Sequence, residues 1–127
     1  MTIEQTFEEW LENINQTETV DNSIEGFNFG LIETTNGFEM YLIGSKKFEI
    51  DDEDWATHVD FEPKQKYFQF GKEFSADKDW QAIQQLSEKL IRSYVASEKF
   101  KTSLFANAKG ITTGFDDGNL TVIKAND

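Results

Sequence analysis

The fold is decided by one stretch of sequence, EGFNFGLIETTNGFEMYLIGS, which spans residues 25–45. Apolar residues alternate along both of its halves, as they do in strands with one buried face. The alternating positions are Phe27, Phe29 and Leu31 in the first half and Phe38, Met40 and Leu42 in the second. Between the halves stands Asn36-Gly37, a strong turn signal because both residues tolerate positive φ. The stretch therefore predicts a β-hairpin, and its glycines predict bulges or bends at Gly26, Gly30 and Gly44.

Other short apolar patterns predict further strands. Residues 111–115 and 120–124 flank the turn sequence Asp116-Asp117-Gly118-Asn119, which predicts a second hairpin. Tyr67, Phe68 and Phe70 predict a strand after Pro63, and Phe48 with Ile50 predicts a short one before it.

Two regions have the spacing of amphipathic helices. Residues 3–15 place Ile3, Phe7, Trp10, Leu11 and Ile14 on one stripe, and Thr2 with Gln5 predicts a capping box at the start. Residues 77–109 continue such a pattern for longer than a typical globular helix. Ser97-Glu98-Lys99 has the form of a break with a new N-cap, so we expect two helices, the second ending at Gly110.

Together these elements predict an α+β fold in a single domain over residues 1–127. Two tight hairpins favour an antiparallel sheet. We expect the N-terminal helix and the C-terminal helix pair to cover one face of that sheet.

Acidic residues dominate the first half of the chain. Residues 1–62 hold sixteen Asp and Glu against Lys46 and Lys47, whereas residues 63–127 hold eight against ten basic residues. Such a field repels nucleic acids and anionic membranes and speeds association with basic partners. Solubility alone is the alternative explanation of the net charge of −12.

The chain shows no sign of export or of membrane insertion. It has no cysteine, its N-terminus is acidic, and no apolar run approaches the roughly 20 residues of a membrane span. We therefore expect a soluble cytoplasmic protein.

Residues 49–63, EIDDEDWATHVDFEP, are the most unusual part of the sequence. They contain seven carboxylates and the chain's only histidine and proline, with no lysine or arginine. Four consecutive acids cannot be buried unpaired, so they face water, a metal or the cations of a partner. Trp55 is either an anchor for this loop or an interface hot spot. We predict partner-binding residues at Asp51, Asp52, Glu53, Asp54, Trp55, Asp60, Phe61, Glu62, Asp116 and Asp117, the last two being first of all turn residues.

Motifs for catalysis and for cofactor binding are missing from the sequence. His58 is a surface or salt-bridged histidine or, less simply, a catalytic base, but no nucleophile elbow or oxyanion loop accompanies it. The acids of residues 51–60 are hard ligands suited to Ca²⁺ or Mg²⁺, yet the EF-hand pattern and its glycine are absent. We expect no enzyme activity, no dedicated metal site and no cofactor.

The chain resembles the small immunity proteins of bacterial toxin–immunity systems, including contact-dependent inhibition and related polymorphic toxins. The resemblance rests on residues 24–30, 41–44 and 114–118, on Asp54-Trp55, and on Asp60-Phe61-Glu62-Pro63. It implies a cytoplasmic protein that binds a cognate toxin domain, often a basic nuclease, and blocks it.

Three other functions remain open. A nucleic-acid mimic would bind a basic DNA-binding protein, a regulator or adaptor would bind a basic partner that is not a toxin, and a small enzyme would need His58 and Asp60 in one pocket with a serine or tyrosine.

Overall fold

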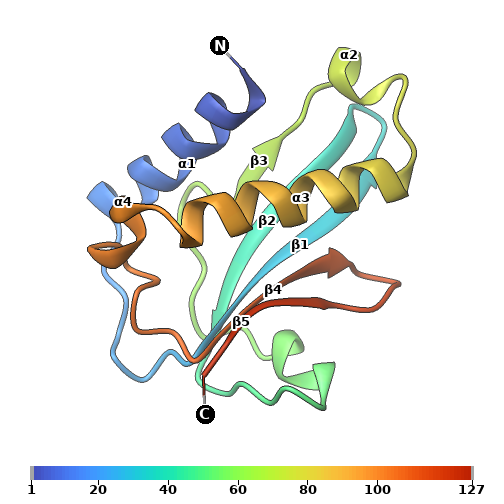
Figure 1. Ribbon diagram of the computed structural model, residues 1–127. Coiled ribbons are helices and arrows are strands. Elements are labelled where there is room, and N and C mark those ends of the chain that lie inside the picture. The colour runs from blue at the N-terminus through green and yellow to red at the C-terminus, as the bar shows by residue number, and fades with distance from the viewer. Residues whose placement is uncertain (1, 127) are drawn as a thin grey trace.

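The predicted hairpin forms the middle of a five-stranded sheet in the computed structural model, which describes residues 2–126 (Figure 1). The strand order is β3-β2-β1-β4-β5. The strands are β1 (Gly26–Thr34), β2 (Gly37–Ser45), β3 (Tyr67–Gln69), β4 (Gly110–Phe115) and β5 (Thr121–Ala125). Both predicted hairpins and the strand after Pro63 are confirmed.

Two long helices cover one face of this sheet, and the α+β prediction is confirmed. They are α1 (Ile3–Thr17) and α3 (Trp80–Val95). Phe7 of α1 packs on Phe29, and Ser87 of α3 lies within hydrogen-bond distance, 2.7 Å, of Thr113, the register partner of Phe29. The remaining helices are short: η1 (Glu53–Thr57), α2 (Lys72–Ser75) and α4 (Glu98–Lys101). Within residues 2–126, none of the helices has the length and apolar composition needed to cross a bilayer.

The sheet is mostly antiparallel, but β1 and β4 are parallel, which the sequence did not predict. The chain leaves β3, passes through α2 and α3, and returns beside β1 in the same direction. A parallel pair needs a long crossover of this kind, usually a helix. Each hairpin could be predicted from the residues around its turn. The parallel pairing that joins the two hairpins depends instead on the path of the helices between them.

The helix boundaries follow the prediction except at the second C-terminal helix. The capping box of Thr2 and Gln5 is present, and α3 ends just before the predicted break at Ser97. However, α4 ends at Lys101 instead of continuing to Gly110. Two backbone N–H groups beyond this point donate to side chains instead of to helical carbonyls. Leu104 N donates to the Asn15 side chain (2.9 Å) and Phe105 N to the Ser103 hydroxyl (3.2 Å). Such bonds compete with helical ones.

The glycines of the hairpin do not form bulges, the first of the two alternatives predicted for them. The β1–β2 register runs unbroken from Gly26↔Ser45 to Thr34↔Gly37, and the sheet's irregularity lies at Ile111/Thr112. The turn itself is Thr35-Asn36, and Gly37 alone takes positive φ (104°) there. The strand predicted at Phe48 and Ile50 is wrong, since that segment has no strand structure.

The face of the sheet away from the helices is covered by aromatic rings that lie on glycines. In β1 and β4, Gly26 pairs with Gly110 and Gly30 with Gly114, with the buried pair Asn28–Thr112 between them. Trp55 and Phe48, whose ring centroids are 5.1 Å apart, lie against Gly26 and Gly110. A Cβ at Gly26 would stand 2.7 Å from the Trp55 ring, and one at Gly110 would overlap the Phe48 ring. The glycines Gly26 and Gly110 therefore make room for rings, and β1 is buried on both faces from Gly26 to Leu31.

We predict that Gly110→Ala destabilises the protein and that Gly118→Ala does not. An added methyl group at Gly110 forces the Phe48 ring to move, which costs about 1–3 kcal/mol. At Gly118 the nearest atom is 3.8 Å away, so the change should stay within roughly 0.5 kcal/mol. Urea unfolding of both variants measures the difference, and equal stabilities would contradict this account of the covered face.

Candidate functional site

The acidic segment is fastened to the body of the protein. Its centre is η1, where the Asp52 side chain accepts a hydrogen bond from Asp54 N (2.9 Å) and the Thr57 hydroxyl donates to the Asp54 carbonyl (2.7 Å). Trp55 projects from this turn onto Gly26 and is only 4% exposed. The structure therefore shows Trp55 as a loop anchor, the first of the two roles considered for it. The burial of the ring argues against its direct contact with a partner.

Three other predicted residues make contacts within the chain. Phe61 packs edge-on against Phe27 of the core, with ring centroids 6.2 Å apart. Asp60 accepts a hydrogen bond from Lys46 N (2.8 Å), and Glu62 forms an ion pair with Lys66 (3.0 Å). These residues shape the loop.

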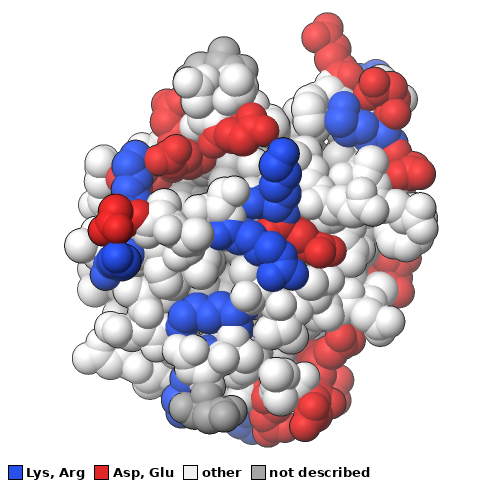
Figure 2. Space-filling view, in the orientation of Figure 1, with Lys and Arg blue, Asp and Glu red and all other residues white. Residues whose placement is uncertain are grey.

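Asp51, Asp54 and Asp117 are the predicted acids whose carboxylates remain turned to solvent. All three residues are exposed, and among residues 2–126 their side chains take part in no hydrogen bond or ion pair. On the helix-bearing face, basic side chains gather over α3 with some acidic ones among them, and further acidic side chains lie around the edge, including the region of η1 at the lower right (Figure 2).

Glu53 joins the acidic turn to the second hairpin. Its carboxylate accepts a hydrogen bond from Leu120 N (2.7 Å), just beyond the turn that carries Asp116 and Asp117. Two acidic segments more than sixty residues apart in sequence are therefore neighbours in the fold, as the predicted binding surface requires.

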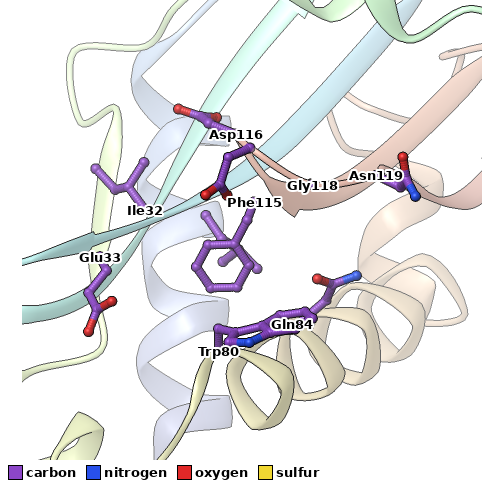
Figure 3. A pocket seen from close by; sticks show the side chains of 10 residues that line it. Ile32, Glu33, Trp80, Gln84, Phe115, Asp116, Gly118 and Asn119 are labelled. Atoms are coloured by element: carbon purple, nitrogen blue, oxygen red, sulfur yellow. The ribbon is translucent and has the colours of Figure 1, made fainter.

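A cleft opens beside this hairpin, between the end of β1, the start of α3 and the β4–β5 turn (Figure 3). Its volume is about 730 Å³. Its lining carries three carboxylates and no basic side chain. The lining residues are Leu31, Ile32, Glu33, Trp80, Gln84, Phe115, Asp116, Asp117, Gly118 and Asn119.

The cleft exists because β4 ends before β1 does. The β1–β4 pairing stops at Leu31↔Phe115, while β1 continues to Thr34 with only β2 beside it. Phe115 then forms the floor, and Trp80, 55% exposed, stands edge-on to it at 6.2 Å and 89°. Glu33, Trp80 and Gln84 were not predicted as site residues. The sequence feature that could have indicated an exposed Trp80 is its position. It directly follows the N-cap Asp79 and is the first residue of the apolar stripe of α3.

Tyr41 holds Asp116 in place at the rim. Its ring lies on Gly30, where an added Cβ would overlap it, and its hydroxyl donates to Asp116 Oδ1. Burial, and then the hydrogen bond and the negative charge of Asp116, raise the pKa of the Tyr41 phenol well above its ordinary value of 10.0. Beyond this contact lies a second hollow of about 490 Å³, which includes Val59, Lys66 and Tyr67. Asp116 and Ile32 line both hollows and separate them.

His58, the chain's one histidine, is exposed and lines neither hollow. Over the described residues, His, Asp and Glu side chains form no group of three or more that could hold a metal ion. Comparison of the chain with protein-family models, with curated proteins and with solved structures found no match.

We predict that Asp116→Asn lowers the pH at which Tyr41 ionises. Since the folded-state pKa of Tyr41 is raised, this group's stabilising contribution is present below about pH 10 and is lost as the pH rises through the folded value. Removing the negative charge of Asp116 removes part of what raises the pKa of Tyr41, whereas the effect of burial remains. Phenolate absorbance during alkaline titration measures the change, with Tyr41→Phe identifying the signal. An unchanged titration in Asp116→Asn would show that the contact has no electrostatic effect.

Proposed function

We propose that this chain is an acidic cytoplasmic protein that neutralises a basic partner protein by binding it, as immunity proteins do with toxin domains. One observation carries the proposal: the turn of residues 51–54 and the turn of residues 116–117 form one acidic surface, joined by the Glu53–Leu120 contact. Beside it lies an open cleft with an exposed tryptophan and no basic side chain.

The way this surface is held favours binding. Trp55 is buried on the sheet, so the acidic turn loses little conformational freedom when a partner arrives. Asp51 and Asp54 remain available to steer a positively charged protein, and electrostatic steering can raise association rates by roughly 10- to 1,000-fold. For an inhibitor, fast encounter is useful because the target acts until it is bound.

The basic partner of the proposal is a toxin domain that grips phosphates through lysines and arginines. A carboxylate surface can occupy such a cationic groove and exclude its substrate. This mode needs no reaction by the acidic protein itself.

We predict that the double variant Asp51→Asn/Asp54→Asn slows association with the partner. Partners are first recovered from native cytoplasm at low salt and identified, and one is then purified. Its association and dissociation rates are measured over a range of salt concentrations. The double variant should associate about fivefold more slowly at low salt and show a weaker salt dependence.

The matched control is Glu4→Gln/Glu9→Gln, which removes the same charge from exposed positions of α1. It should associate at nearly the native rate. Equal effects of the two pairs, or no effect of the first, would contradict the proposed surface. If the purified partner has no toxic activity that binding suppresses, the adaptor function replaces the immunity function.

A further inference from the structure

We infer that the cleft beside Trp80 receives an arginine side chain from an extended segment of the basic partner, an inference that rests on the proposed function. The chain offers there a flat aromatic ring, several carboxylates and an unpaired strand edge. These three features together fit a guanidinium group better than any other protein side chain.

The aromatic ring is Trp80. The other two tryptophans are 7% and 4% exposed, whereas Trp80 is 55% exposed at the start of α3. Figure 3 shows its indole next to Phe115, on the α3 side of the cleft. Contact with Phe115 holds the ring while much of its surface stays open to solvent. Tryptophan is the best aromatic partner of a cation, and arginine is the cation most often found on it.

The carboxylates come from two sides of the cleft. Glu33 extends from β1, and Asp116 and Asp117 come from the β4–β5 turn (Figure 3). Because the Tyr41 hydroxyl occupies Asp116 Oδ1, the Asp116 side chain is oriented and its other oxygen stays available. A guanidinium group donates two parallel hydrogen bonds to a carboxylate and stacks on an aromatic face at the same time. An ammonium group, a strongly hydrated point charge, matches this arrangement less well.

The strand edge supplies contacts for the main chain that carries the arginine. Residues 32–34 of β1 have no strand beside them on the β4 side. Glu33 pairs with Phe38 of β2, but the Phe38 carbonyl accepts a hydrogen bond from Phe70 N (3.1 Å) on the far side of β2. Leu42, opposite Phe29, likewise donates from its N–H to the Lys66 carbonyl (3.0 Å). The odd-numbered residues of β1 therefore direct their backbone groups away from β2, to the β4 side. The alternation of strand hydrogen bonds then directs the N–H and C=O of Glu33 into the cleft. An extended peptide can pair with that edge and place its side chain over Trp80.

The test is an NMR titration of the full chain with the peptide acetyl-Gly-Arg-Gly-amide. The matched probe has citrulline, a neutral residue of nearly the same shape, in place of arginine, and a third probe has lysine. The Trp80 indole signal, assigned with Trp80→Phe, should shift in a saturable way together with the amides of Glu33, Asp116 and Asp117. Trp10, whose indole donates to the Gln65 carbonyl (2.7 Å), and the buried Trp55 serve as internal references.

We expect the citrulline peptide to cause no saturable shift and the lysine peptide to bind roughly two- to fivefold more weakly than the arginine peptide. Glu33→Gln should weaken the arginine peptide several-fold, whereas Glu9→Gln, the same change on exposed α1, should leave it unchanged. Equal shifts from the arginine and citrulline peptides, or shifts that leave Trp80 unaffected, would overturn the inference.

Failure of this inference can be distinguished from failure of the proposed function. If Asp51→Asn/Asp54→Asn slows association with the partner but Trp80 does not respond to the arginine peptide, the acidic surface stands and the arginine site does not. If Trp80 responds as expected but no basic partner is neutralised, the cleft binds arginine and the immunity function is wrong.

Discussion

The contact on which the rest of the structure depends is that of two aromatic rings with two glycines. Phe48 and Trp55 lie on Gly26 and Gly110, which face each other in the parallel pair of β1 and β4. Side chains at these glycines would overlap the rings or crowd them. This contact covers the Gly26–Gly110 end of the sheet face that the helices leave open, and it fastens the acidic loop to the sheet. Burying large rings also supplies much apolar contact area for few residues.

The candidate site follows from that fixed layer. With Trp55 buried, η1 holds Glu53 where it can accept a hydrogen bond from Leu120, and so supports the hairpin that carries Asp116 and Asp117. On the same face Tyr41 crosses Gly30 to reach Asp116. The early end of β4 then leaves the cleft between this hairpin and β1. Acidic residues from distant parts of the sequence thus lie next to one another at the surface.

Features that depend on neighbouring residues could be predicted from the sequence, and features that depend on distant contacts could not. The hairpins, the capping box of Thr2 and the break before Glu98 each arise from a few adjacent residues. The parallel pairing of β1 with β4 depends on the crossover through α3, and the role of the glycines depends on which rings cross them. The acidic residues were found by composition, but Trp80 fitted the helical stripe. Its exposure results from its position at the open end of the sheet, which periodicity does not encode.

The central claim is that the acidic turn is ordered before any partner binds. Backbone ¹⁵N relaxation of the free protein tests this most directly, by comparing residues 53–57 with the strands β1 and β2. The structure predicts order parameters in η1 close to those of the sheet, about 0.85, because Trp55 anchors the turn. Order parameters below about 0.6 across η1 would contradict the account, since the acidic surface would then form only on binding.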